Sequence, residues 1–249
     1  MSISGVVVQN SALETCAMLE DNSIGAIISD PPFFISTGRD GGGFGDDPWA
    51  TDLSTLTAIT DYLMPHMEEF KRVVRPGGAI VLLAGGHASS CWYRVAEAAN
   101  LKWMAENLIL WNTGKPRQRN FGSLHTLALW WAVRGQKHSF NLDSGKAIYS
   151  NVMVAKKVPI GAREHISQKP VCLTNFYVSL LTDEDDIVFD PFCGSGSTLV
   201  SAELCGRQWL GCDLNANNVE VASHRAATAD MQDVGELKLW VNGKVHAVA

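Results

Sequence analysis

The sequence lacks the marks of a secreted, membrane-spanning or metal-binding chain. No apolar run reaches about 18 residues and the start has no basic-then-apolar pattern, so we expect neither a membrane span nor a signal peptide. The six cysteines form no CxxC pair and show no His/Cys metal spacing. They are typical of reduced thiols in a cytoplasmic protein, without a disulfide framework or a metal.

The chain also has little positive charge overall. Its net charge of −6 argues weakly against a nucleic-acid partner. The charges are unevenly spread, however, because the segment from Gly114 to Lys169 carries a balance of +8 and the remainder −14. This segregation indicates a patch that faces a polyanion, on an otherwise acidic body. Chance clustering on a solvated insertion is the alternative explanation.

Hydrophobic periodicity predicts an α/β fold. Apolar runs typical of buried strands cover residues 24–29, 79–84, 104–111, 124–133, 186–190 and 208–213. Helical periodicity covers residues 12–19, 53–74, 87–100, 170–181, 197–205 and 215–228. Buried strands that alternate with amphipathic helices predict a doubly wound, mostly parallel sheet. The tail, 238–245, is typical of a hairpin around an Asn-Gly turn.

We expect a single domain over residues 1–249, because a chain with 46% hydrophobic residues can bury one large core. Two segments are expected to depart from the regular alternation. Residues 34–51 are rich in glycine and predict a mobile loop beside the site. Residues 112–162 hold most of the basic patch and predict an inserted region.

The string from Phe189 to Thr198, FDPFCGSGST, predicts a pocket for a small charged cofactor. It follows a strand, and in open α/β sheets ligands lie beyond the carboxyl ends of strands. Its two glycines allow a sharp bend and a close approach, and the next helix begins with free N–H groups. An acidic residue after the following strand suits the hydroxyls of a ribose. The candidate cofactor residues are Asp190, Phe192, Cys193, Gly194, Ser195, Gly196, Ser197 and Asp213.

The string fits S-adenosylmethionine better than a cofactor with a pyrophosphate. A dinucleotide fingerprint would need a third glycine where Leu199 stands, and a phosphate-binding loop would need a lysine before Ser197. S-adenosylmethionine has a ribose and an adenine but no phosphate. A turn that only packs a helix on a strand would show the same two glycines, and the flanking acidic residues argue against it.

The string Asp30-Pro31-Pro32-Phe33 predicts a clamp for a planar base with an exocyclic amine. Asp30 offers a carboxylate acceptor, Pro31 a carbonyl in a rigid turn, and Phe33 a flat apolar face. Two acceptors on the amine would localise its lone pair, which could then attack the methyl of a sulfonium directly. The base would have to be taken out of its helix, and stacking on Phe33 would return on the order of 1–3 kcal/mol. An ordinary Asp-Pro-Pro turn is the alternative for this string alone.

In this order the two strings resemble the motifs of the β-arrangement, amino-methylating DNA methyltransferases, which act on adenine N6 or cytosine N4. The catalytic motif of that family resembles DPPF, and its cofactor motif resembles DPFCGSGST. The segment from His165 to Pro170 resembles the one that helps to hold the methionine part of S-adenosylmethionine, which adds His165 and Lys169 to the cofactor residues. The resemblance implies a Rossmann-like methyltransferase fold, base flipping and often a homodimer.

The same resemblance makes double-stranded DNA the expected partner, with adenine favoured because the motif begins with Asp. Residues 112–162 would then recognise the target, and the candidate phosphate contacts are Lys115, Arg117, Arg119, Lys156 and Lys157. Two departures stand out: Phe33 replaces the commoner Tyr, and Gln9-Asn10-Ser11 stands where the family usually has an acidic residue. The alternatives are a cytosine-N4 enzyme, a non-catalytic DNA-binding protein on this fold, and methylation of RNA or a protein amide.

Overall fold

The computed structural model describes residues 5–32, 55–85, 88–111, 124–142, 150–164, 168–242 and 244–247. In these ranges ten strands form one sheet, in the order β1-β8-β7-β2-β3-β5-β4-β6-β9-β10. The strands are β1 (Val6–Gln9), β2 (Ile24–Ser29), β3 (Val74–Ala84), β4 (Lys102–Trp111), β5 (His125–Ala132), β6 (Val152–Ala155), β7 (Ile187–Asp190), β8 (Gln208–Asp213), β9 (Leu237–Val241) and β10 (Lys244–Ala247).

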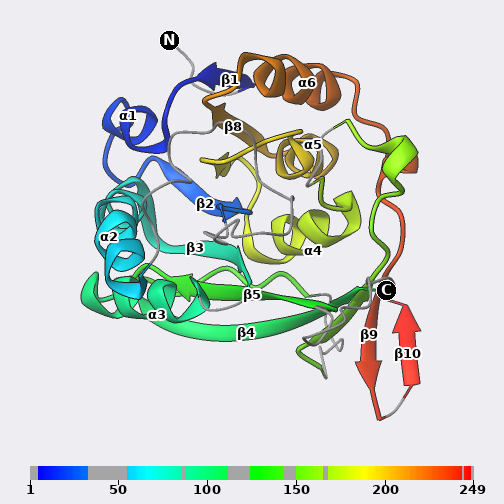
Figure 1. Ribbon diagram of the computed structural model, residues 1–249, viewed down its shortest axis with the longest axis horizontal. Helices are drawn as coiled ribbons and strands as arrows, with labels where there is room; N and C mark the ends of the chain where they lie inside the picture. Colours follow the sequence, from blue (N-terminus) through cyan, green and yellow to red (C-terminus); the bar gives the residue numbers. More distant parts are fainter. Residues whose placement is uncertain are drawn as a thin grey trace.

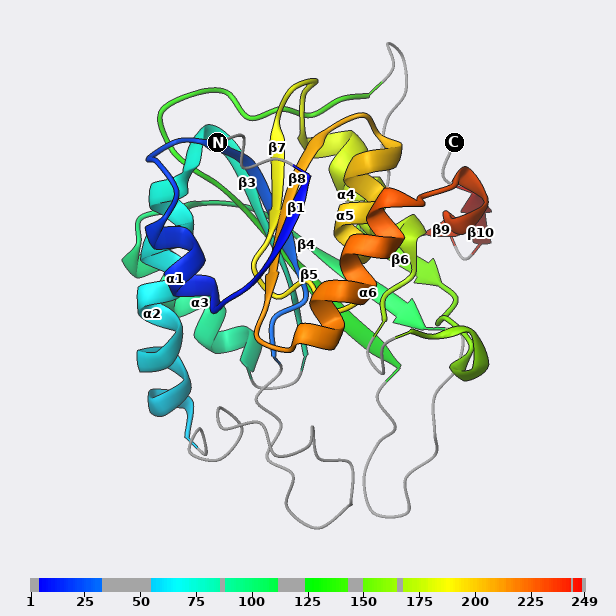
Figure 2. The same cartoon turned by 90° about the horizontal axis from the view of Figure 1, so that it is seen from above.

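Helices cover both faces of the sheet (Figures 1 and 2). They are α1 (Ala12–Ala17), α2 (Leu56–Val73), α3 (Ala88–Ala98), α4 (Val171–Leu181), α5 (Ser197–Leu204) and α6 (Ala216–Ala227), with short 3-10 turns at Ile160–Ala162 and Met231–Asp233. The first three lie on one face and the last three on the other. Among the described residues, no helix is long and apolar enough to cross a membrane.

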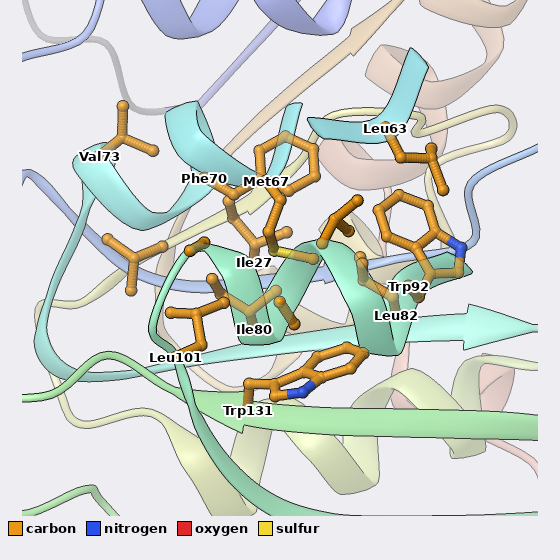
Figure 3. Packing of buried hydrophobic residues seen from close by; sticks show 14 of the residues in the cluster. Ile27, Leu63, Met67, Phe70, Val73, Ile80, Leu82, Trp92, Leu101 and Trp131 are labelled. Carbon is orange, nitrogen blue, oxygen red and sulfur yellow. The ribbon is translucent and has the colours of Figure 1, made fainter. Parts of the chain in front are cut away.

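The sheet separates two apolar cores because its central strands are buried on both sides. Along β3, Ile80 and Leu82 face the core under α2 and α3, and Val81 and Leu83 face the core under α4 and α5. Figure 3 shows the first core, where Phe70 of α2 packs among residues of the sheet and of α3. Such two-sided burial explains why these strands read as continuous apolar runs in the sequence.

The predicted α/β fold is confirmed, with one refinement of the sheet. Strands β1, β8, β7, β2 and β3 are parallel to one another, as predicted. Beyond β3 the sheet is mixed, because β5 is antiparallel to both of its neighbours and the β9–β10 hairpin adds antiparallel pairs. The predicted tail hairpin thus extends the sheet, with Met153 of β6 opposite Leu239 of β9.

Strand β3 begins five residues earlier than its apolar run indicates. It starts at Val74 and includes the Arg75-Pro76-Gly77-Gly78 turn signal, with a register shift opposite Ile24 and Ala26 of β2. Gly78 makes this possible, because a Cβ there would lie 2.5 Å from the carbonyl oxygen of Gly25. The close approach of the two backbones therefore keeps the strand in the sheet.

The range 112–162, expected to be an insertion, includes two strands of the sheet itself. β5 lies between β3 and β4, and β6 lies between β4 and β9. Of this range, residues 112–123 and 143–149 lie outside the described residues, as does the predicted loop 34–51. Neither β5 nor β6 contains a lysine or an arginine, so the basic residues of this range lie outside its two strands.

Candidate active site

The site lies where the direction of the chain reverses in the sheet. Strand β2 pairs with β7, and the chain passes from β2 through α2 to β3 on one side and from β7 through α5 to β8 on the other. The two helices cover opposite faces, so the connections that follow β2 and β7 lead to opposite sides of the sheet, which makes this place a topological switch point (Figure 2). Ligands of doubly wound sheets bind in such crevices. The structure brings the two sequence motifs together at this point.

Asp190 joins the two motifs. Its Oδ1 accepts a hydrogen bond from Oγ of Ser29 at 2.5 Å and another from the backbone N–H of Phe192 at 3.2 Å. The side chain is buried, and burial raises the pKa of Asp190 to about 6, even though the bonds from Ser29, Thr198 and Phe192 act in the opposite direction. The charge of Asp30 adds to the increase. Asp190 therefore fixes the end of β2 against the glycine elbow, which is the turn from Pro191 to Gly196 that precedes α5.

The elbow itself turns at two glycines with positive φ. Gly194 has φ +49° and donates its N–H to Oδ2 of Asp213 at 3.1 Å. Gly196 has φ +76° and stands before α5, and a Cβ there would lie 2.9 Å from the Cβ of Ala222 on α6. The close approach that Gly196 permits is thus to α6, whereas the sequence suggested an approach to a ligand.

Asp213 holds the far side of the elbow. Its Oδ1 accepts hydrogen bonds from the N–H of Asn215 at 2.9 Å and from Nδ2 of Asn218 at 3.0 Å. With the bond from Gly194, three donors meet a carboxylate that can accept about four. Asp213 is partly exposed at the end of β8, so it has the position and the acceptor capacity that a ribose hydroxyl requires.

Three residues in or directly after the elbow stabilise it through packing and hydrogen bonds: Cys193, Ser195 and Ser197. Cys193 is buried, and burial raises the pKa of its thiol well above the usual value, which suits a packing residue and not a nucleophile. The carbonyl of Ser195 accepts a hydrogen bond from Arg225, and Oγ of Ser197 donates to the carbonyl of Lys169 at 2.8 Å.

His66 is a neighbour of the elbow that the sequence did not reveal. It lies on the buried face of α2, with its ring centroid 6.0 Å from that of Phe192 in the elbow. Its Nδ1 lies 2.9 Å from the carbonyl oxygen of Tyr62, and burial lowers the pKa of His66. A histidine at helical spacing among Leu63, Met67 and Phe70 has the pattern of a core residue, and only its ring pair with Phe192 shows that it lies near the elbow.

The side chain of Lys169 lies against Asp30, whereas its backbone carbonyl meets Ser197 at the start of α5. Its Nζ forms an ion pair with Oδ2 of Asp30, at the end of β2. Pro31 is buried beside it and Pro32 is half-buried. Phe33 and His165, the other residues expected here, lie outside the described residues. The resemblance placed Lys169 at the cofactor, so the ion pair gives it a different neighbour.

Lys156 and Lys157 follow β6 at the same edge of the sheet. β6 is parallel to β4, with Ala155 opposite Trp111, so both strands end there. The Nζ of Lys157 lies 5.6 Å above the ring of Trp111, whose Nε1 donates to Oγ1 of Thr126 at 3.0 Å. Desolvation and the charges of Arg163 and Lys169 lower the pKa of Lys157. Lys157 is therefore within electrostatic reach of Lys169, which pairs with Asp30 at the end of β2. Lys115, Arg117 and Arg119 lie outside the described residues.

The segment Gln9-Asn10-Ser11, where an acidic residue would be usual, has a structural role. Ser11 forms a capping box with Glu14 at the start of α1, and the N–H of Asn10 donates to the carbonyl of Asp213 at 3.1 Å. These bonds fix the end of β1 beside β8. Among the described residues, no group of three or more His, Cys, Asp or Glu could hold a metal ion.

A doubly wound sheet with acidic residues at three adjacent strand ends and a glycine elbow at the switch point defines an α/β enzyme that uses a nucleoside-like cofactor. The sequence profile of the DNA methylase family N6_N4_Mtase matches residues 24–224, so the chain belongs to this family of amino-methylating enzymes. The family expected from the two motifs is confirmed.

Curated relatives and solved structures agree with this assignment. The type II methyltransferase M.HpaI of Haemophilus parainfluenzae is 27% identical over 87% of this chain and 72% of its own, and M2.MboI of Moraxella bovis is 24% identical over 97% and 94%. The complex of M1.HpyAVI with S-adenosylmethionine has a similar fold (TM-score 0.65, 22% identity, covering 88% of this chain and 98% of that one). So has the cytosine-N4-specific PvuII DNA methyltransferase (TM-score 0.70, 16%, 91% and 94%).

Proposed function

We propose that this protein transfers a methyl group from S-adenosylmethionine to N6 of adenine in double-stranded DNA. The observation that carries the proposal is the bond between Ser29 and Asp190, which joins the catalytic strand end to the cofactor elbow. Asp30 follows Ser29 directly, so its carboxylate lies beside the crevice in which a cofactor would bind. Membership of the DNA methylase family supports the reaction class.

The elbow suits S-adenosylmethionine. The N-terminus of α5 follows Gly196, which has no side chain to cap it, so backbone N–H groups of the first turn can face a polar part of a ligand. Asp213 would accept from the ribose hydroxyls, and Phe192, backed by His66, would contact the apolar part of the cofactor. When bound, S-adenosylmethionine supplies a methyl group on a sulfonium, which is electrophilic without a metal.

Asp30 and the carbonyl of Pro31 would prepare the amine. The lone pair of an aromatic amine is delocalised into the ring, which makes the nitrogen a poor nucleophile. Two acceptors at its hydrogens draw the nitrogen toward tetrahedral geometry and localise the pair for attack on the methyl carbon. As the new N–C bond forms, the bond between the methyl carbon and the sulfur would break and leave a neutral thioether. The amine loses one proton, which the Asp30 carboxylate would accept.

The base must leave the duplex to reach Asp30, because its amine is paired inside the helix. Flipping costs a few kcal/mol, and stacking on an aromatic ring offsets part of this. Phe33 is the residue proposed for that stacking. Lys156 and Lys157 would contact phosphates near the flipped base, since they lie at the same sheet edge as Asp30. The expected homodimer and the cytoplasmic location stay predictions.

The test is to incubate duplex DNA with the protein and labelled S-adenosylmethionine, digest it to nucleosides and identify the product. We expect 6-methyladenine. Finding 4-methylcytosine instead would assign the enzyme to the other amine of its family. Single-stranded RNA and a glutamine-containing protein serve as competing substrates. A protein that neither binds S-adenosylmethionine nor methylates any of them would favour the non-catalytic DNA-binding alternative.

A further inference from the structure

Lys169 connects the catalytic strand to the cofactor elbow. Its Nζ forms the ion pair with Oδ2 of Asp30, and its carbonyl oxygen accepts the hydrogen bond from Ser197 at the start of α5. Pro170 follows it with φ −64° and is the N-cap residue of α4, which limits the paths that the backbone can take. A single residue thus contacts both motifs, through its side chain on one side and its backbone on the other.

The ion pair lies where water screens it little. The side chain of Lys169 is 13% exposed and that of Asp30 22%. Ion pairs on an open surface contribute little because water weakens the attraction, and the attraction grows as the effective dielectric falls. The geometry therefore favours a fixed arrangement of the two side chains over a fluctuating surface contact.

Lys169 also lies near a second carboxylate, that of Asp190, through its partner Asp30. The charge of Asp30 contributes to the raised pKa of Asp190, so the two acidic groups lie within electrostatic reach of each other. Lys169 is in turn within reach of Lys157, whose pKa it helps to lower. Lys169 therefore contacts Asp30 directly and has the carboxylate of Asp190 and the ammonium group of Lys157 as further charged neighbours.

We propose that Lys169 is a positioning residue for methyl transfer, which holds the Asp30 carboxylate in one orientation at the end of β2. An ammonium group only donates hydrogen bonds, so its partner must be an acceptor. An ionised Asp30 is the form that gripping the amine of a base requires. This inference rests on the proposed function. In it the main partner of Lys169 is Asp30, and not the carboxylate of the cofactor.

The test separates the two partners by their effects on turnover and on cofactor affinity. Lys169→Met keeps the length of the side chain and removes its charge. We expect kcat at saturating S-adenosylmethionine and DNA to fall about 100-fold, since a misplaced catalytic group loses rates of this order. The Kd of S-adenosylmethionine, measured by calorimetry, should change less than about threefold. Lys102→Met, at the exposed start of β4, is the matched control and should change neither quantity.

Lys169→Arg provides the second variant. Arginine keeps a positive charge at this position and can still pair with the carboxylate of Asp30. The Lys169→Arg protein should therefore fold even if the Lys169→Met protein does not. Under the proposal Lys169→Arg recovers part of kcat and leaves the Kd of S-adenosylmethionine unchanged. A Kd raised tenfold or more in either variant, with kcat at saturation intact, would show that Lys169 serves the cofactor and overturn the proposal. A wild-type protein that binds S-adenosylmethionine but methylates no DNA would instead refute the proposed function.

Discussion

Oγ of Ser29 donates a hydrogen bond of 2.5 Å to the buried carboxylate of Asp190, across 161 positions of sequence. Ser29 is the last residue of β2 and Asp190 the last of β7, and these strands are neighbours in the sheet. Each is followed by one of the two motifs, so the bond sets the spacing between them. A change in either residue should therefore act both on the strand end that precedes Asp30 and on the elbow that precedes α5.

The raised pKa of Asp190 predicts a pH-dependent stability. An unfolded aspartate ionises near pH 3.8, whereas burial holds the folded-state pKa at about 6. Between these values the folded protein binds one more proton than the unfolded chain, so the free energy of unfolding falls as pH rises. We expect the wild type to lose about 2 kcal/mol relative to Asp190→Asn from pH 4 to pH 6, and no more above pH 7. Urea unfolding of both proteins across this range measures it; parallel curves would contradict the prediction.

Replacing the proposed amine acceptor should stop the reaction without emptying the cofactor site. We expect Asp30→Asn to lower kcat by roughly 10²–10⁴-fold, because a neutral amide grips an amine less well and presents an NH₂ group to it. The affinity for S-adenosylmethionine should stay close to that of the wild type. Asp61→Asn on the exposed side of α2 is the control. A parallel loss of cofactor affinity would place Asp30 in the cofactor site instead.

The sequence predicted the convergence of the motifs for a physical reason. The apolar runs that end at Ser29 and Asp190 are typical of strands buried on both faces, and parallel strands bring their carboxyl ends to one edge. The partner of Lys169 could not be predicted, because it depends on how the chain before α4 crosses that edge. Likewise β6 was missed, since four apolar residues in a basic segment give too short a pattern.

His66 and Gly196 show a second limit of sequence reasoning. A histidine at helical spacing among apolar residues has the same pattern whether it faces the core or the site, and only the path of the elbow brings Phe192 to it. A glycine in a cofactor motif can be needed for a ligand or for a neighbouring helix. The position of Ala222 on α6, which the motif does not contain, decides between these roles for Gly196.

The position of Lys157 over the ring of Trp111 leads to a prediction of how the affinity for DNA depends on salt. If Lys157 contacts one phosphate, Lys157→Met should reduce the slope of log K against log salt for DNA binding by about one. The affinity for S-adenosylmethionine should not change, because Lys157 lies at the end of β6 and not at the elbow. Fluorescence anisotropy with a labelled duplex at several salt concentrations measures the slope. Lys102→Met is the control, and equal slopes for all three proteins would remove Lys157 from the interface.

The two positive-φ glycines that flank α5 allow backbone strain to be separated from packing. A Cβ added at Gly206, which has φ +68°, would meet no atom of the described residues within 4 Å beyond its chain neighbours. At Gly196, with φ +76°, a Cβ would meet Ala222. Gly206→Ala should therefore lose only the strain of the left-handed conformation, about 1 kcal/mol of unfolding free energy. Gly196→Ala should lose this and a further 1–3 kcal/mol, roughly, from overpacking against α6.

Urea unfolding gives both values, and calorimetry with S-adenosylmethionine gives a second, independent comparison. Gly206 lies at the far end of α5 from the elbow, so Gly206→Ala should bind the cofactor as the wild type does. Gly196→Ala displaces the start of α5 and with it Ser197, so its cofactor affinity should fall together with its stability. Equal losses of stability in the two variants would mean that α6 moves aside without cost, and that Gly196 is present for its φ angle alone.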